Sequence, residues 1–534
     1  MEQIFFNGNI ITMDEACPYV EAVYIADGRI RKRGSSQEIL ALKKEKTVCT
    51  DLAGKTMLPG FIDGHSHFTG LANSLSQCDL SDAADFDEII AKMKVFIEEN
   101  QIPEGEWVAG SNYDHNFLKE KVHPDRHVLD RISENHPIVI VHASSHMGVA
   151  NTNALRCQKL TAAQPDPEGG HYGREAGTGE LSGYMEENAF ISFQNQMPMI
   201  SMDRLMNLMK KAQQIYASYG ITTVQEGMVS KPLFQILQQA KKNEIFYLDL
   251  VEYLDLETCA ELFEEQKKSW KGYENHVKIG GFKMFLDGSP QGRTAWMKEP
   301  YENAPDGYCG YPIKTDEKVY GLILTALQKG AQLLTHCNGD AAAEQLVTQF
   351  EKVHREYPEY PLNRPVMIHA QLVQEPELMR MKKLTMTPSF FVAHTWYWGD
   401  IHIENFGKER ADRISPAGTA VRLGLPFTFH QDSPVLKPDE LETVWCAVRR
   451  ITKNGVKLSE AERISVYEAL KAMTVNGALQ YFEENEKGSV EEGKLADLII
   501  LDKNPLEVPV DEIKNIRVLE TFKEGRSIYK RKNL

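Results

Sequence analysis

Two histidines separated by one residue follow a short apolar run near the start of the chain. The run is Phe61 and Ile62, and the histidines are His65 and His67. In a β-strand the side chains of residues i and i+2 project from the same face, so both imidazoles can point at one ion. Neutral imidazole is the commonest metal ligand in proteins. Because surface or core histidines would give the same pair, a metal site requires further ligands elsewhere in the chain.

Further ligand candidates occur at the predicted ends of four later strands. Lys283 lies in one apolar run, His336 and His369 end two others, and Asp432 follows the last. The carboxyl ends of barrel strands form the rim at which TIM-barrel active sites lie. Four histidines and a carboxylate that meet at this rim would suit Zn²⁺ or a similar ion. The spacing therefore predicts a metal centre.

The segments that position these residues alternate between strand and helix from about residue 205 onward. Helices of this length between strands are typical of parallel βαβ units, and eight strands close a barrel. The sequence thus predicts an α/β fold with a (β/α)8 TIM-type barrel over residues 58–479. Its eight strands are expected at 61–67, 221–225, 246–253, 277–286, 332–336, 366–370, 385–392 and 427–430, with one helical stretch around 410–423 before the last.

The two ends of the chain contain short strands and Gly turns instead. Asp27-Gly28 and Glu524-Gly525 each stand between extended runs, which is a hairpin signal. A small sheet needs a partner to be stable, so residues 1–57 and 480–534 are predicted to form one composite β-sandwich domain. The segment from about 72 to 205 lacks the alternation. We expect a large insertion there that covers the active-site mouth and shapes the substrate site.

Composition restricts the function classes. The 534 residues carry a formal net charge of −16, which argues against a nucleic-acid partner. The eight cysteines are scattered without a Cys-x-x-Cys pair, no signal peptide is visible, and no apolar run approaches the roughly 20 residues of a membrane span. We expect a cytoplasmic protein with a small-molecule substrate and no membrane partner; whether it forms a homo-oligomer stays open. The Lys- and Glu-rich runs at 42–46 and 483–487 are predicted to be solvated faces.

The order His-x-His, Lys, His, His, Asp on successive strands resembles the amidohydrolase superfamily. The sequence motifs are similar to those of one branch of this superfamily, which contains N-substituted formamide deformylases and exoenzyme-regulatory-type metal-dependent hydrolases. In that branch a small residue and Ser more often stand where this chain has His430 and Gln431. The segments that carry the resemblance are 58–67, 283–289, 432–435, 476–478 and 488–497.

The resemblance implies a binuclear centre, with zinc as the favoured metal. His65 and His67 would hold the buried metal with Asp432. The ligands of the more exposed metal would be His336 and His369. Lys283 would be N-carboxylated and would bridge the two metals. Mn²⁺, Fe²⁺ or Co²⁺ would also suit these ligands.

The implied reaction is hydrolysis of an amide-type C–N bond outside peptides, in an N-acyl or N-formyl amine or a cyclic amide. Hydroxide held by the metals would attack, and Asp432 would act as general base and then as general acid. Two alternatives stay open. The same metals would also serve the hydrolysis of an ester, lactone or imide, and the fold would also suit a non-catalytic regulatory or binding protein.

Substrate contacts are predicted at four positions. His146, in the insertion, would donate to the developing oxyanion, and His394 and Trp396 follow the seventh strand. Arg293 would bind a substrate carboxylate. Loop anchoring would explain the aromatic residues equally well. Two acidic residues near the ligands are instead predicted to have supporting roles, Glu226 as a neighbour of a ligand and Asp287 in a turn.

Overall fold

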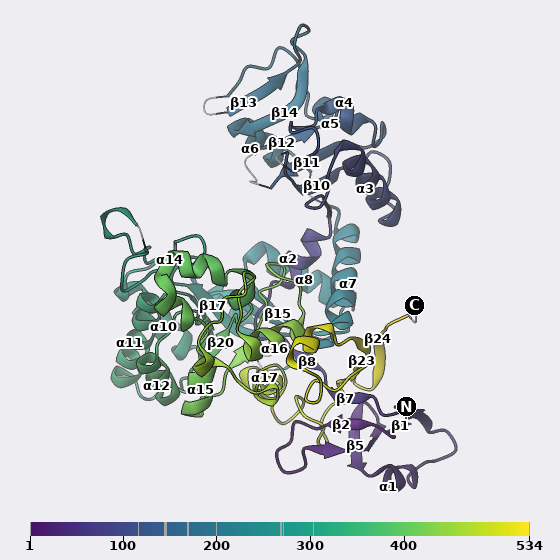
Figure 1. Ribbon diagram of the computed structural model, residues 1–534, viewed down its shortest axis with the longest axis vertical. Helices are drawn as coiled ribbons and strands as arrows, with labels where there is room; N and C mark the ends of the chain where they lie inside the picture. Colours follow the sequence, from purple (N-terminus) through teal and green to yellow (C-terminus); the bar gives the residue numbers. More distant parts are fainter. Residues whose placement is uncertain are drawn as a thin grey trace. The chain divides into compact units, whose positions relative to one another are not determined.

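The computed structural model describes residues 2–115, 117–143, 147–167, 170–198, 200–266, 270, 272–302 and 304–532. The chain divides into two compact units (Figure 1). The first unit contains residues 1–71 and 209–534, and the second contains residues 72–208. Within the described residues, every helix is too short or too polar to cross a lipid bilayer.

An eight-stranded sheet forms the centre of the first unit, and every pair of neighbouring strands in it is parallel. This confirms the predicted α/β class. The sheet is curled, and the backbone N–H of Gly64 donates to the carbonyl of Phe429 in the strand at the other edge at 3.2 Å. In spatial order the strands are β21 (Thr428–Phe429), β20 (Thr387–Phe390), β19 (Val366–His369), β18 (Gln332–Cys337), β17 (Val277–Phe285), β16 (Asp249–Asp255), β15 (Ile221–Val229) and β8 (Phe61–Ile62).

Helices connect these strands, because apolar residues at helical spacing need the face of a sheet to cover them. Helix α11, for example, buries Leu346, Phe350 and Val353. The helices between strands are α7 (Met202–Ser218), α8 (Lys231–Lys242), α9 (Leu256–Glu265), α10 (Asp316–Gln328), α11 (Asp340–Glu356), α12 (Glu375–Lys383), α13 (His394–Tyr397), α14 (Gly399–Asp412) and α15 (Ala417–Leu423), and α16 (Glu440–Arg449), α17 (Val466–Ala472) and α18 (Val475–Gln480) follow β21.

Two predicted elements were wrong in extent. The strand expected at 61–67 ends at Ile62, because the carboxylate of Asp63 accepts the backbone N–H of His65 at 3.1 Å and turns the chain. His65 and His67 therefore lie in the loop before α2 (Phe68–Ser74), not on one strand face. The single helical stretch around 410–423 is instead α14 and α15. They are separated at Ser415, whose φ is 47°, outside the helical range.

The chain ends form two further sheets that share a core. Strand β22 pairs antiparallel with β7, so the C-terminal segment is bonded directly to the N-terminal one. Phe5, Ile25, Met57, Leu498 and Phe522 pack in one buried cluster between them. In spatial order one sheet contains β5 (Arg29–Gly34), β4 (Ala22–Ala26), β1 (Glu2–Phe6) and β6 (Val48–Asp51), with α1 (Ser36–Leu40) after β5, and the other contains β24 (Arg526–Lys530), β23 (Val518–Lys523), β22 (Leu498–Leu501), β7 (Thr56–Pro59), β2 (Asn9–Ile11) and β3 (Tyr19–Val20).

A buried ionic network joins the parallel sheet to the C-terminal segment. Asp249, the first residue of β16, accepts from the ammonium groups of Lys487 at 2.5 Å and Lys523 at 2.6 Å. Lys487 also pairs with Glu483 at 2.8 Å. Since Glu483 and Lys487 are 7% and 2% exposed, the prediction of a solvated face at 483–487 was wrong for these two residues. The other run, 42–46, is exposed as predicted.

The second unit is a mixed six-stranded sheet with helices. Strands β9, β10 and β11 are parallel, and the remaining pairs are antiparallel. Its spatial order is β13 (Gly170–Arg174), β14 (Leu181–Glu187), β12 (Met147–Ala150), β11 (Ile138–His142), β10 (Val108–Tyr113) and β9 (Gln77–Asp79), and its helices are α3 (Phe86–Glu99), α4 (Arg126–Asp130), α5 (Thr152–Cys157) and α6 (Asn188–Asn195). That this segment covers an active-site mouth stays a prediction.

Candidate metal centre

Three of the predicted ligands converge beyond the carboxyl ends of β8 and β21. Asp432 Oδ1 lies 3.5 Å from His65 Nε2 and 3.4 Å from His67 Nε2. Donor atoms bonded to one tetrahedral Zn²⁺ lie about 3.3 Å apart, given Zn–N and Zn–O distances of about 2.0–2.2 Å. Asp432 Oδ1 is buried and has no hydrogen-bond partner among the described residues. A buried carboxylate oxygen needs a partner, so these three side chains fit a divalent ion.

Two residues of β15 lie beside these imidazoles. The amide of Gln225 donates through Nε2 to the Tyr481 hydroxyl at 2.8 Å, so its Oε1 is left to face His65 Nδ1 at 2.5 Å. His65 therefore carries its proton on Nδ1 and presents the lone pair of Nε2 to the site. The carboxylate of Glu226 lies farther from His67, with Oε1 3.7 Å from Nδ1. A hydrogen bond such as that of Gln225 fixes the tautomer and rotation of a metal-binding histidine. Glu226 lies beside a ligand, as predicted.

The other three predicted ligands lie beside this group. His336 Nδ1 and His369 Nε2 face each other at 3.0 Å, and His369 Nε2 is 4.0 Å from Asp432 Oδ2. Lys283 Nζ lies 3.1 Å from His65 Nε2. The structure thus brings together all six side chains at one end of the parallel sheet.

Burial controls the charge of this cluster. It lowers the pKa of the His336 imidazole to about 3, with a further contribution from Lys283. It also lowers the pKa of the Lys283 ammonium to about 7, which Asp432 partly opposes. Desolvation disfavours the charged form of a base. The imidazole of His336 is therefore neutral at neutral pH, which is the form that binds metals.

Two residues of the cluster have left-handed backbone conformations. The φ angles are 70° at His369 and 54° at Asp432. Non-glycine residues in this region cost on the order of 1–3 kcal/mol, and such strain gathers at functional sites. Here the strained backbone turns both side chains toward one point after β19 and β21.

His430 belongs to the cluster and was not predicted as a site residue. Its Nε2 lies 3.1 Å from His369 Nδ1, and its Nδ1 lies 2.9 Å from the hydroxyl of Ser389 in β20. The departure from the family pattern immediately before Asp432 was the available signal. Because His430 contacts the nitrogen of His369 that points away from His336, it orients His369.

Replacing His430 with Ala should weaken the binding of a divalent ion at His369. Loss of the orienting contact is expected to lower metal affinity by about 10- to 100-fold, measured by competition with a chelator of known affinity. His402 provides a matched control, since it is also a buried histidine and bonds to His394, 2.9 Å away. His402→Ala should keep the native metal affinity. Equal affinities in native protein and His430→Ala would refute the orienting role.

Asp287 supports the loop after β18. Its carboxylate accepts three backbone N–H groups, from Trp296 at 3.0 Å, Asn338 at 2.9 Å and Gly339 at 2.7 Å. It also lies 3.9 Å from His336 Nε2. These contacts confirm the predicted structural role of Asp287 in its turn. The residue also supports His336.

The predicted substrate contacts lie in varied surroundings. His394 is buried against Phe391, whose ring centroid is 5.2 Å from that of His430. Trp396 packs on Trp445 at a centroid distance of 5.0 Å. The guanidinium of Arg293 donates to Asn405 Oδ1 at 2.8 Å. His146 lies outside the described residues. The substrate roles of all four stay predictions.

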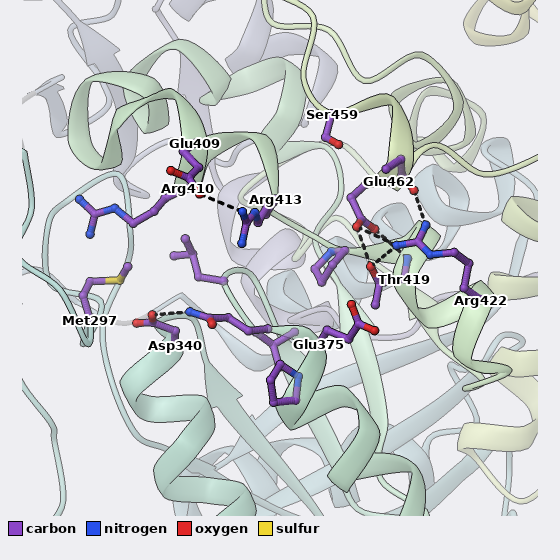
Figure 2. A pocket seen from close by; sticks show the side chains of 16 residues that line it. Met297, Asp340, Glu375, Glu409, Arg410, Arg413, Thr419, Arg422, Ser459 and Glu462 are labelled. Atoms are coloured by element: carbon purple, nitrogen blue, oxygen red, sulfur yellow. Dashed lines mark hydrogen bonds and ion pairs between the residues drawn. The ribbon is translucent and has the colours of Figure 1, made fainter.

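The first unit also contains a cavity of about 460 Å³ between α12, α14 and α15. Figure 2 shows that charged side chains line it, with Arg422 bonded to Glu462 and Arg413 to Glu409. The lining includes none of the six ligand candidates. Arg410, Arg413 and Arg422 in its lining already have carboxylate or carbonyl partners. These arginines therefore do not form an unpaired cationic site in the cavity.

Comparison with known proteins identifies the family. A family model described as "Amidohydrolase family" matches residues 49–529. The chain belongs to the amidohydrolase family. YtcJ of Bacillus subtilis (strain 168) is 28% identical over 548 residues, which cover 99% of this chain and 100% of the relative. The N-substituted formamide deformylase of Arthrobacter pascens is 26% identical over 551 residues, with coverage of 99% and 98%.

A solved structure has a similar fold. The crystal structure of an uncharacterized metal-dependent hydrolase from Pyrococcus furiosus has a TM-score of 0.76 and 24% identity. The match covers 95% of this chain and 100% of that chain, so the two proteins share their fold. The resemblance to the amidohydrolase branch with formamide deformylases, inferred from the motifs, is confirmed.

Proposed function

We propose that this amidohydrolase cleaves an amide-type C–N bond in an N-acyl or N-formyl amine, or in a cyclic amide, with two divalent ions, zinc being favoured. The observation that carries the proposal is the convergence of His65 and His67 on the unbonded, buried Oδ1 of Asp432. The formamide deformylase relative supports the amide class. When bound, such ions would activate water and polarise a carbonyl group.

The ligands divide into two groups joined by Lys283. His65 and His67 would hold one ion with Asp432, and His336 and His369 would hold the other. Lys283 would be carboxylated: the neutral amine adds to CO₂, one N–H proton leaves to solvent, and an anionic carbamate results. Its buried Nζ at 3.1 Å from His65 Nε2 supports a position between the two groups.

Asp432 is proposed to move the proton. Its Oδ2 faces the His369 side of the cluster while Oδ1 faces His65 and His67. The carboxylate would accept a proton from the attacking water and deliver it to the leaving amine, as general base and then acid. Arg293, His394 and Trp396 are proposed to contact the substrate.

We propose that the first unit is a barrel enzyme. The eight parallel strands would form a closed (β/α)8 barrel, which the Gly64–Phe429 hydrogen bond between its edges supports. The two terminal sheets would form one composite β-sandwich domain, supported by their shared core. The ligands would then lie at the carboxyl end of the barrel strands, where the active sites of such enzymes are found.

A substrate panel tests the proposal. Protein stripped with a chelator and reloaded with Zn²⁺ should hydrolyse N-formyl or N-acyl amines, or cyclic amides, and the stripped protein should not. Amine release by the reloaded protein is the measurement. If the reloaded protein cleaved esters or lactones but no amide, the C–N assignment would be wrong. Absence of hydrolysis across the whole panel would overturn the hydrolase proposal.

A further inference from the structure

A second group of metal-ligating side chains lies in the second unit, at residues 72–208. It consists of Asp114, His115 and His142, whose donor atoms lie within 4.8 Å of one another. Asp114 and His115 follow the end of β10, and His142 is the last residue of β11. Strands β10 and β11 are parallel neighbours (Figure 1), and Tyr113 is paired with His142. In open α/β sheets, ligands bind just beyond the carboxyl ends of the parallel strands.

The distances match one tetrahedral ion. His115 Nδ1 lies 3.2 Å from His142 Nε2, and Asp114 Oδ1 lies 3.4 Å from His142 Nε2 and 3.8 Å from His115 Nδ1. Ligands of one Zn²⁺ are expected about 3.3 Å apart, given metal–ligand bonds of about 2.0–2.2 Å. These three separations are close to that value and resemble those around Asp432 in the first unit.

Hydrogen bonds and a divalent ion require different protonation of these three side chains. A neutral imidazole has one donor and one acceptor nitrogen, and an ionised carboxylate only accepts. If His142 Nε2 donates to Asp114, it cannot also accept from His115 Nδ1. A divalent ion, in contrast, takes a lone pair from all three atoms at once.

We propose that Asp114, His115 and His142 bind a divalent transition-metal ion, separate from the ions at the six ligands of the first unit. Two imidazoles and a carboxylate suit Zn²⁺ and similar borderline ions. Three protein ligands leave one coordination position open, as in zinc sites that bind a water molecule or a further ligand. The side chains of Asp114 and His115 are 24% and 26% exposed, so an ion can enter, whereas the His142 side chain is 8% exposed and would bind the ion from the buried side.

Elemental mass spectrometry on the full chain tests this site. Protein stripped with a chelator, reloaded with Zn²⁺ alone and freed of excess metal is compared with His115→Ala and His142→Ala. Each variant should bind about one equivalent less than the native chain. His171→Ala is the matched control: this histidine is in the same unit, is 51% exposed and bonds to Asp166 at 2.7 Å. It should keep the native count.

A second set of variants separates this site from the proposed catalytic centre. The double variant His67→Ala, His369→Ala should lose the metal of the first unit and still retain about one equivalent, which adding His142→Ala should remove. The number of bound metal ions does not depend on turnover. A protein that is inactive but keeps this one metal equivalent would therefore refute the proposed function and leave the second metal site supported. Native metal counts in both His115→Ala and His142→Ala would overturn the site.

Discussion

Asp432→Asn is expected to abolish hydrolysis while leaving the fold intact. The substitution preserves the size of the side chain but removes the charge that faces His65 and His67 and the group proposed to transfer the proton. Loss of general acid–base catalysis alone costs about 10²–10⁴-fold in rate, and the weakened metal site adds to this. We therefore expect kcat/KM for an N-formyl or N-acyl amine to fall by at least about 10³-fold.

The thermal stability of the metal-free variant should be close to that of the native metal-free protein. Oδ1 of Asp432 has no hydrogen-bond partner among the described residues, and burial raises the pKa of this carboxyl. Without metal, removing a poorly compensated buried charge carries no penalty. Circular dichroism melting of both metal-free proteins is the measurement.

Glu462→Gln is the matched control for activity. Glu462 is also a buried carboxylate of the first unit, but it accepts from the backbone N–H and the hydroxyl of Thr419 and lines the cavity of Figure 2. Its replacement should leave kcat/KM within a few-fold of the native value. If Asp432→Asn kept turnover within tenfold of Glu462→Gln, the assigned role of Asp432 would be wrong.

The positions of the ligands were predictable because strand ends are encoded locally. His369 ends an apolar run and is the last residue of β19, and His336 is next to last in β18. A parallel sheet then brings such residues to one edge whatever their separation in sequence. The spacing argument for His65 and His67 was wrong in detail, since both follow a turn at Asp63. They still converge on Asp432, and the contact with Gln225 orients His65.

Contacts between distant segments could not be read from the sequence. His430 looked like a departure from the family pattern, and only the fold places it against His369. The run 483–487 has the composition of a solvated face, yet the fold buries Lys487 beside Asp249, 238 positions away. Charged residues are seldom buried unless they are paired. The pairing partner lies on another element, and local composition contains no signal for it.

Asp249→Asn is expected to lower the free energy of unfolding of the protein by about 3–5 kcal/mol, the usual cost of removing one partner of a buried ion pair. Lys487 and Lys523, which are 2% and 3% exposed, would lose their shared carboxylate and keep their charges. The ionic contact between β16 and the C-terminal segment would be lost with it. Denaturant or thermal unfolding of the metal-free protein, followed by circular dichroism, measures the change.

The pH dependence of this effect has a definite sign. Lys487 and Lys523, opposing the effect of burial, hold the pKa of Asp249 well below its ordinary value. A carboxyl with a lowered pKa in the folded state contributes its full stability above the unfolded pKa of about 3.9 and loses it as pH falls toward the folded pKa. The stability difference between native protein and Asp249→Asn should therefore be constant near neutral pH and narrow below about pH 4.

Glu409→Gln is the control for this prediction. Glu409 and Arg413 form an ion pair at 2.9 Å whose side chains are 85% and 67% exposed, and solvent screens such pairs so that they contribute about 0–1 kcal/mol. The control should unfold like the native protein at every pH. A stability loss in Asp249→Asn no larger than in Glu409→Gln would show that the buried network does not hold the C-terminal segment on the parallel sheet.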